Sequence, residues 1–389
     1  DSTKNCQLGG YMKIAYVRSY TSTDYHNAKA SSDAIGYGRT CSLVLERELG
    51  KLRSTELITV ATPDDVSLGL TSWNMRQITQ LVDVVKRDEI DAVFLFHSTT
   101  PDAAFVRRNL DETGFQGTLV GYTHGSHWDP SDTFRYDNHP KLKWEDLGLL
   151  LSMDRILLAS EYIRTRIAAS VRAEAVGALN EFLTNSRVVG IPIDIEGIDR
   201  NRGLARSTSP RLLFNHSFVS SKGADEFVDM LPVLLEQNKA LSVDITRAPI
   251  PGSQTEGRLR TVCSKFGQRV RVHEGLDPSA YASLLWQCTH QVSTATHETF
   301  GVATAEAMAA GVACLVPDRA VYPELVGRST KEAIYDPSFK LQRLTEWLGM
   351  DEATRRDIAT RQCNSVRTRF NGRAVAAAVG EVIRKCILT

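Results

Sequence analysis

The feature that most limits how this chain can fold is an alternation of short, apolar, β-branched runs with longer segments of helical period. In the first half the short runs predict strands at residues 13–18, 57–61, 92–97, 118–122, 155–159 and 187–191. Segments of helical period fall between most of them, at residues 38–49, 75–86, 103–110 and 161–168. Such alternation is typical of parallel βαβ units. The first half therefore predicts an open, doubly wound α/β domain.

The second half repeats the pattern after a polar stretch without periodicity. Its strands are expected at residues 212–215, 241–246, 270–273, 291–293 and 313–316, and its helices include 224–236, 278–286 and 302–310. We expect a linker at residues 201–210, because polar residues without a period mark loops. The prediction is an α/β fold of two doubly wound, Rossmann-like domains, residues 12–200 and 211–371, that face a cleft. Ligands of such sheets bind beyond the carboxyl ends of the strands.

Composition excludes several classes of function. Lysine plus arginine and aspartate plus glutamate each number 46, so the formal net charge is zero, which argues against a non-specific nucleic-acid binder. The seven cysteines are scattered, with no Cys-x-x-Cys pair, and predict reduced thiols of a cytoplasmic protein. No apolar run reaches the roughly 18 residues of a membrane span. Residues 1–11 are polar, and we expect a tag remnant or an extension there.

The most informative stretch is residues 297–311, which follows a predicted strand and enters a helix that Gly311 closes. Glu298 lies in the loop before this helix, and Glu306 lies inside it. Carboxylates accept hydrogen bonds from paired sugar hydroxyls, and the free N–H groups at a helix start favour a phosphate. Two glutamates at this spacing would by themselves more often be solvated surface residues.

The whole stretch resembles the Glu-x7-Glu motif of the retaining family-4 glycosyltransferases, E-x-F-G-x-x-x-x-E-A-x-A-x-G. The matching residues are Glu298, Phe300, Gly301, Glu306, Ala307, Ala309 and Gly311. The resemblance implies a GT-B fold, with a C-terminal helix at residues 372–389 that returns to the N-terminal domain. It implies that Glu298 contacts the donor sugar and Glu306 the ribose. The backbone N–H groups of Phe300, Gly301 and Val302 would meet the sugar or the diphosphate.

A second match opens the C-terminal domain, where a strand is followed by a loop and a Lys-Gly pair at residues 222–223. In the family this lysine neutralises the donor diphosphate, so Lys222 is the expected counterpart. The family commonly has an arginine five residues earlier, where this chain has Ser217. His216 and Arg247 are candidates to compensate. The alternatives are a less tightly held diphosphate, an unusual donor or slow transfer.

In the N-terminal half, the loop after residues 118–122 resembles the family's histidine loop over the reacting sugar. We favour His124 for this role over His127, which we expect to bind the acceptor. Trp128 would stack on the acceptor sugar, although an aromatic side chain in a loop is more often simply packed.

Closer to the N-terminus, Gly36 and Gly38 resemble the family's glycine-rich loop, where the backbone approaches the donor. The preceding segment, residues 19–31, contains Asp24 and His26, which we expect to meet the acceptor.

Other catalytic motifs are missing. The chain has no Gly-x-Ser-x-Gly elbow, no phosphate loop of the Gly-x-x-x-x-Gly-Lys-Ser/Thr type and no His-Glu-x-x-His. Adjacent Asp64 and Asp65 are better explained as a solvated turn than as a metal site. We therefore expect catalysis without a metal or a cofactor beyond the nucleoside-diphosphate sugar.

The prediction is a transferase that moves a sugar from a UDP-, GDP- or ADP-type donor to an acceptor hydroxyl with retention of configuration. Lys222, Glu298 and His124 would carry the chemistry. Two alternatives remain: an enzyme like the GT-B epimerase of UDP-N-acetylglucosamine, and a catalytically weak sugar-nucleotide binding protein. Arg164, Arg166 and Arg172 would favour peripheral membrane contact, although three arginines on a helix are more often a solvated face.

Overall fold

The structure is a computed structural model that describes residues 11–18, 37–62, 69–132 and 141–388. Five of the residues named above lie outside these ranges: Asp24, His26, Gly36, Asp64 and Asp65.

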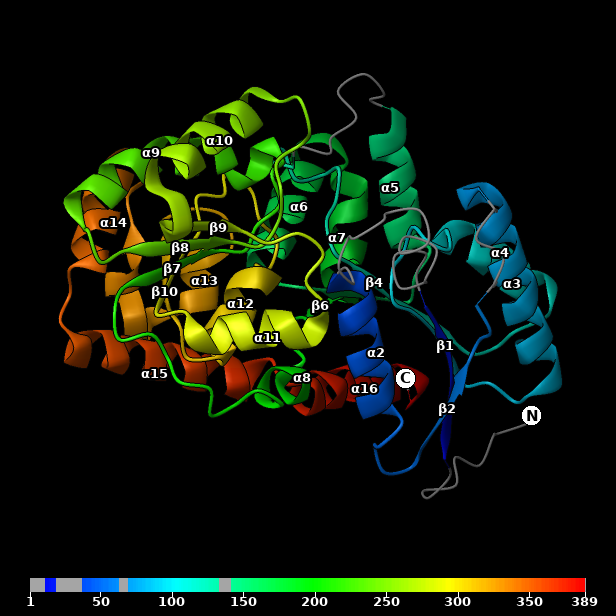
Figure 1. The fold of residues 1–389 in the computed structure, drawn as a ribbon. Helices are drawn as coiled ribbons and strands as arrows, with labels where there is room; N and C mark the ends of the chain where they lie inside the picture. The colour runs from blue at the N-terminus through cyan, green and yellow to red at the C-terminus, as the bar shows by residue number, and fades with distance from the viewer. Residues whose placement is uncertain (1–10, 19–36, 63–68, 133–140, 389) are drawn as a thin grey trace.

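Two parallel six-stranded sheets organise the described chain (Figure 1). The first has the order β2-β1-β3-β4-β5-β6. Its strands are β1 (Met12–Val17), β2 (Thr55–Thr59), β3 (Ala92–Leu95), β4 (Thr118–Thr123), β5 (Arg155–Leu158) and β6 (Ser186–Val188). β3 and β4 are buried along their whole length, as expected for a parallel sheet with both faces covered. We call this sheet with its helices the N-terminal unit.

Six helices accompany this sheet within the described residues: α2 (Tyr37–Leu49), α3 (Leu70–Arg87), α4 (Ala103–Glu112), α5 (Lys141–Leu151), α6 (Glu161–Glu174) and α7 (Val176–Asn185). Several begin where the sequence supplies a cap. The Ser160 side chain accepts from the Ile163 N–H at the start of α6, and Asp102 does the same for Phe105 at the start of α4.

The second sheet has the order β12-β11-β10-β7-β8-β9. Its strands are β7 (Arg211–Phe214), β8 (Ser242–Ile245), β9 (Val270–Val272), β10 (His290–Val292), β11 (Ala313–Pro317) and β12 (Ile334–Tyr335). The expectation of two doubly wound α/β sheets is confirmed, and no predicted strand end is off by more than three residues. β12 was not expected, because a strand of two residues is too short to show a period.

The helices around the second sheet are α9 (Ala224–Gln237), α10 (Gln254–Phe266), α11 (Pro278–Gln287), α12 (Val302–Ala309), α13 (Tyr322–Val326), α14 (Lys340–Leu348) and α15 (Glu352–Arg369). Short α8 (Ile195–Asp199) precedes the sheet. We call this assembly the C-terminal unit. The last helix, α16 (Gly372–Leu388), leaves it and packs against α2, β4 and β5 of the N-terminal unit (Figure 1).

The two units meet where the chain crosses between them. The Ile193 N–H donates to the Phe370 carbonyl at 2.8 Å, and the Tyr122 hydroxyl donates to the Gly190 carbonyl at 2.8 Å. The Phe370 ring packs edge-on against Phe300 with centroids 4.8 Å apart. One hydrophobic core consequently runs from the first sheet into the second.

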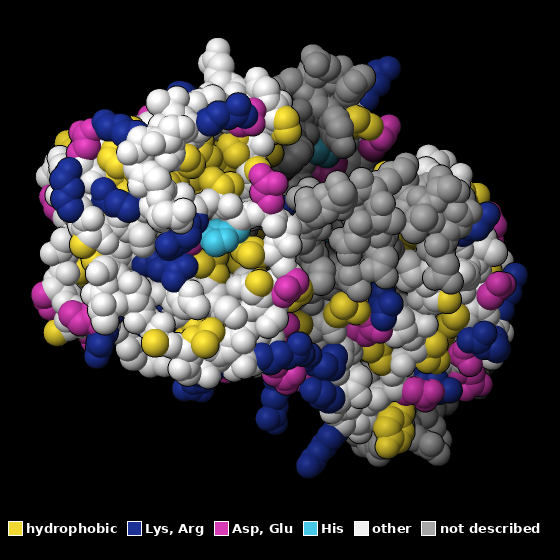
Figure 2. Space-filling model, in the orientation of Figure 1, with side chains coloured by type: hydrophobic (Ala, Val, Ile, Leu, Met, Phe, Trp, Pro, Cys, Tyr) yellow, Lys and Arg dark blue, Asp and Glu magenta, His cyan; other side chains and the backbone are white. Residues whose placement is uncertain are grey.

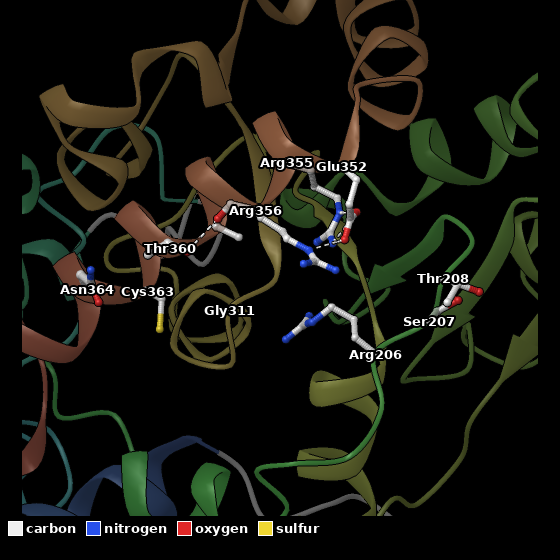
Figure 3. A pocket seen from close by; sticks show the side chains of 11 residues that line it. Arg206, Ser207, Thr208, Gly311, Glu352, Arg355, Arg356, Thr360, Cys363 and Asn364 are labelled. Carbon is white, nitrogen blue, oxygen red and sulfur yellow. Dashed lines mark hydrogen bonds and ion pairs between the residues drawn. The ribbon is translucent and has the colours of Figure 1, made fainter.

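The segment predicted as a linker, residues 201–210, is held against the C-terminal unit by Arg206. Arg206 donates to the carbonyls of Cys288 and Ala310, the second at the end of α12. A cavity of about 600 Å³ opens beside it, between the linker and α15 (Figure 3). The other two arginines that line the cavity, Arg355 and Arg356, both pair with Glu352.

On the face drawn in Figure 2, basic and acidic side chains are interspersed, without a continuous basic stripe. Among the described helices none is long and apolar enough to cross a membrane.

Candidate active site

The centre of the candidate site is an ion pair at the carboxyl ends of β7 and β10. Lys222 closes the short 3-10 turn η2 (Ser220–Lys222) after β7, and Glu298 lies in the loop after β10. The Lys222 Nζ lies 2.7 Å from the Glu298 Oε2, and it also contacts the His297 carbonyl at 3.4 Å. The two residues that the sequence assigned to diphosphate and sugar are therefore paired directly.

The environment keeps Glu298 ionised. Burial alone would raise the pKa of its carboxyl, but the charge and hydrogen bond of Lys222 outweigh burial and hold the pKa below its usual range. Backbone donors help, because the Thr299 N–H lies 3.1 Å from the Glu298 Oε1 and the Phe300 N–H also stabilises the charge. An anionic ligand that draws Lys222 away therefore removes the main cation of Glu298, and hydrogen-bond donors must then stabilise the carboxylate.

α12 begins at Gly301, whose φ of +86° is a left-handed conformation that favours glycine. The first backbone N–H groups of a helix have no acceptor within the helix, and no side chain of the described residues caps α12. The Phe300 ring is buried and packs on Phe370, so only the backbone of Phe300 is placed to meet a ligand. This is the helix start that the sequence analysis matched to donor binding.

Glu306, one and a half turns into α12, has a different environment from Glu298. Its Oε2 accepts a hydrogen bond from the Tyr281 hydroxyl at 2.9 Å, and Tyr281 in turn accepts from Asn215 at 2.9 Å. Burial raises the pKa of Glu306 to about 7, and Asp194 adds to the shift while Tyr281 and Arg247 oppose it. Glu306 therefore titrates near neutral pH.

The side chains near Ser217, where the family usually has an arginine, differ in the charge that they supply. His216 is buried, and burial together with the charge of Lys222 lowers its pKa to about 4, so it is neutral at pH 7 and supplies no charge. Ser217 is half-buried and brings no charge. Arg247 acts on both Glu306 and Tyr281 through its charge. Of the two proposed substitutes, Arg247 is the one that supplies a cation here.

His124, at the end of β4, is held by an aromatic cluster. Its ring stacks on Tyr122 with centroids 5.2 Å apart, and its Nε2 lies 2.7 Å from the Phe96 carbonyl. Burial lowers its pKa to about 4, although the Phe96 carbonyl opposes this. Since a carbonyl only accepts, the neutral ring carries its proton on Nε2 and presents Nδ1 as an acceptor.

Trp128 requires a correction. Its side chain is fully buried, its Nε1 donates to the Lys143 carbonyl at 2.7 Å, and Trp144 packs against its ring. The expectation that it stacks on an acceptor sugar is not met, because the ring belongs to the core. His127 is half-buried, and its backbone N–H donates to Asp146 at 3.0 Å.

Two of the three arginines considered for membrane contact are engaged within the protein. Arg164 donates to Ser186 at 3.0 Å, and Arg166 lies 3.2 Å from Asp129.

Gly38 lies in the first turn of α2. Among the described residues, no group of three or more His, Cys, Asp or Glu side chains could hold a metal ion.

The Glu298 loop also contacts the N-terminal unit. The Thr299 hydroxyl donates to the His124 carbonyl at 2.7 Å, and the Ser160 hydroxyl donates to the Thr299 carbonyl at 2.7 Å. Glu324 of α13 accepts from the N–H groups of Glu161 and Tyr162, so it caps α6 from the other unit. The two units are therefore joined at the loop that carries the candidate carboxylate.

Three further residues of this site were not predicted from the sequence. The Tyr281 hydroxyl donates to Glu306, the Asn215 amide donates to Tyr281, and the His97 ring packs at a tilt against His124 with centroids 5.1 Å apart. His97 and Asn215 each lie at the carboxyl end of a predicted strand, where ligands of α/β sheets bind, so their position could have indicated a role in the site. Tyr281 lies inside a helix, and nothing local marks it.

This fold defines a class of protein. Two parallel six-stranded sheets with flanking helices form the GT-B architecture of glycosyltransferases, and residues 196–361 match the model of the family "Glycosyl transferases group 1". No curated protein sequence matches the chain.

Particular solved structures share the whole fold. Sucrose-phosphate synthase from Thermosynechococcus elongatus has a TM-score of 0.68 and 14% identity, over 97% of this chain and 99% of that one. Trehalose-6-phosphate synthase OtsA has a TM-score of 0.70 and 12% identity, over 95% and 98%. Anabaena HepE, solved in complex with UDP and glucose, has a TM-score of 0.62 and 15% identity, over 96% and 100%.

Proposed function

We propose that the protein is a glycosyltransferase that moves a sugar from a nucleoside-diphosphate donor to an acceptor hydroxyl with retention of configuration. The observation that carries this proposal is the pairing of Lys222 with Glu298 at 2.7 Å, beside the start of α12. A cation next to a helix N-terminus suits a departing diphosphate, whose charge grows as the glycosidic bond breaks.

In this scheme the diphosphate takes the place of Glu298 as the partner of Lys222. The released Glu298 carboxylate accepts hydrogen bonds from donor-sugar hydroxyls, and Glu306 accepts from the ribose diol. The neutral His124 ring orients the sugar by accepting at Nδ1. Attack on the face that the diphosphate leaves retains the configuration, and the leaving phosphate oxygen takes the proton of the acceptor hydroxyl.

We propose UDP as the first nucleotide to test, because HepE was solved with UDP and an Escherichia coli trehalose-6-phosphate structure with UDP-2-fluoro glucose. Thermal unfolding in the presence of UDP, GDP, ADP and dTDP identifies the base. A nucleotide at about a hundred times its Kd stabilises the fold by roughly 2.7 kcal/mol. No shift with any nucleotide would contradict the proposal.

The first mutational test is Lys222→Met, which keeps the length of the side chain and removes its charge. We expect UDP release from UDP-glucose to fall by at least about a hundredfold, because one preorganised charge of this kind contributes roughly 3–4 kcal/mol. Lys340→Met is the matched control, since Lys340 pairs with Glu226 outside the site. Full turnover by Lys222→Met would mean that the diphosphate is held elsewhere.

Product analysis with the active donor separates the alternatives. A glycosylated acceptor supports transfer, whereas an epimerised free sugar supports the epimerase. Binding of nucleotide sugar without any turnover supports the binding protein, for which Ser217 in place of the usual arginine is the motivating observation.

A further inference from the structure

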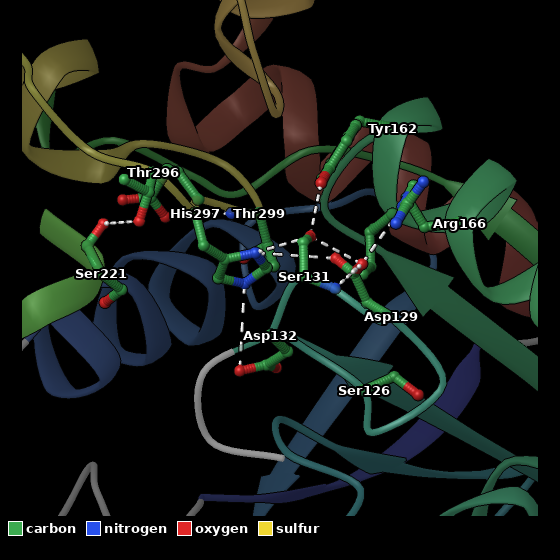
Figure 4. Close-up of polar contacts among 12 residues, drawn as sticks. Ser126, Asp129, Ser131, Asp132, Tyr162, Arg166, Ser221, Thr296, His297 and Thr299 are labelled. Atoms are coloured by element: carbon green, nitrogen blue, oxygen red, sulfur yellow. Dashed lines mark hydrogen bonds and ion pairs between the residues drawn. The ribbon is translucent and has the colours of Figure 1, made fainter.

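One histidine next to Glu298 has no role in the scheme above. His297 points away from the C-terminal unit into a polar cluster of the N-terminal unit (Figure 4). Its Nδ1 lies 3.1 Å from the Ser131 hydroxyl and 3.7 Å from the Asp129 Oδ2, and its Nε2 lies 4.0 Å from the Asp132 Oδ1. The ring is 8% exposed, so these contacts form in a largely dry interface.

The Asp129 carboxylate is satisfied on one side only. Its side chain is completely buried, and its Oδ1 accepts from the Ser131 N–H and hydroxyl and from the Arg166 Nε, at 3.0, 2.8 and 3.2 Å. Within the described part of the chain its Oδ2 has no hydrogen-bond partner. A buried acceptor left in this state costs about 1–3 kcal/mol.

The His297 ring is placed to complete this carboxylate. Its Nδ1 lies 3.7 Å from the Oδ2, about 0.5 Å beyond the range of a hydrogen bond, so a small further closure of the two units would form the bond. His297 faces Asp129 and Asp132 from the N-terminal unit, with Arg166 behind Asp129. On its own side lie Glu298 and Lys222, and Lys222 contacts the His297 carbonyl.

We propose that His297 is a positioning residue that couples closure of the two units to the geometry of the Lys222–Glu298 pair. When the units close, the His297 Nδ1–H donates to Asp129, and this bond sets the backbone between His297 and Glu298. Thr299 follows Glu298 in the same loop, and its hydrogen bonds with the His124 carbonyl and the Ser160 hydroxyl hold the backbone on that side of Glu298. The inference rests on the proposed function for its kinetic consequence, but the contact itself does not.

The kinetic test uses UDP-glucose turnover and UDP affinity in the full chain. We expect His297→Ala to lower kcat at least tenfold and to change the Kd for UDP less than twofold, because the His297 ring faces Ser131 and Asp129 of the N-terminal unit. Asp129→Asn should act alike, and the double variant should be no worse than either single one. Asn places an amide N–H near the position of Nδ1, so His297→Asn should recover part of kcat.

Other results would overturn the proposal. Additive effects of the two substitutions would mean that His297 and Asp129 act separately. A parallel loss of UDP affinity would make His297 a ligand contact, and unchanged kcat would make the contact merely structural.

A second measurement needs neither donor nor activity. Amide hydrogen exchange of the ligand-free protein should rise in the 296–299 and 124–132 segments in His297→Ala, and not in Glu324→Gln, which weakens a different contact between the units by removing the charge and one of its two acceptor oxygens. Equal exchange in His297→Ala and the unaltered protein would overturn the coupling. If the unaltered protein does not turn over UDP-glucose, the proposed function with that donor fails while this exchange measurement still decides the role of His297.

Discussion

At the scale of single residues, the two glutamates of the candidate site share a motif and differ in charge state. Glu298 is held ionised by Lys222, whereas burial raises the pKa of Glu306 to about 7. Sequence spacing places both carboxylates near one helix start, but it does not separate them. The difference arises from partners distant in sequence, a lysine for Glu298 and the Tyr281 hydroxyl for Glu306.

The affinity of the Glu306 site should depend on pH. With a pKa of about 7, Glu306 is roughly one-tenth ionised at pH 6 and nine-tenths at pH 8, so uridine affinity should rise about tenfold across this range if the ribose diol needs the carboxylate. Uridine is the probe because a phosphate group titrates near pH 6 itself. Isothermal calorimetry measures this dependence, and Glu306→Gln should make it flat. A sloping profile in Glu306→Gln would assign the titration to another group.

The contribution of Glu306 to the free energy of unfolding should change with pH in the opposite direction and fall as the pH rises. The folded pKa lies above the unfolded value, so the contribution of Glu306 to stability is present below about pH 4.5 and is lost as pH rises through about 7. In urea unfolding without ligand, Glu306→Gln should lose less stability than the unaltered protein between pH 5.5 and pH 8. Equal losses would contradict the raised pKa.

At the scale of elements, the start of α12 is set by one glycine. A Cβ at Gly301 would lie 3.1 Å from the Leu325 Cδ2 and 3.4 Å from the Tyr322 Cε1, in addition to the left-handed strain at φ +86°. The glycine therefore lets α12 begin close to α13, and Glu324 of α13 caps α6. The same short segment shapes the candidate diphosphate site and the contact between the units.

Gly301→Ala should cost more stability than the same change at a glycine of similar backbone but open surroundings. Gly252 has φ +78° and no atom within 4 Å of a built Cβ, so Gly252→Ala should cost only the left-handed strain of about 1–2 kcal/mol. Gly301→Ala should exceed it by about 1 kcal/mol or more in urea unfolding and should weaken UDP binding. Equal costs at the two glycines would show that the contact with Leu325 is relieved without penalty.

At the scale of the whole molecule, α16 couples the two units. It follows α15 of the C-terminal unit without a break in the described chain and packs on α2 of the N-terminal unit (Figure 1). A Cβ at Gly372 would lie 2.6 Å from Val44, so this end of α16 approaches α2 more closely than an alanine permits. A disturbance at this point should therefore reach both units.

Gly372→Ala should destabilise the protein by about 1–3 kcal/mol, because α16 must move away from α2. Scanning calorimetry should show the N-terminal unit melting earlier, as a broadened or split transition. Gly177→Ala in α7 is the control, since a Cβ there meets no atom within 4 Å and alanine favours a helix. A single unshifted transition in Gly372→Ala would mean that α16 does not couple the units.

Much of the fold follows from local pattern. The β-branched runs and helical periods predicted both sheets, because strands and helices depend on neighbours a few residues away. The two departures have physical causes. β12 is too short to show a period. Trp128 follows a predicted strand, but its side chain is buried, where it donates to the Lys143 carbonyl and packs against Trp144.

The sequence by itself determined the α/β class and the local placement of Glu298 and Glu306 around one helix start. Only the tertiary structure decided that Lys222 neutralises Glu298, that Tyr281 binds Glu306, and that His297 reaches Asp129. These pairs are separated by 76, 25 and more than 160 residues along the chain. Local periodicity carries no information about such distances, because these contacts depend on how the two sheets and their helices pack.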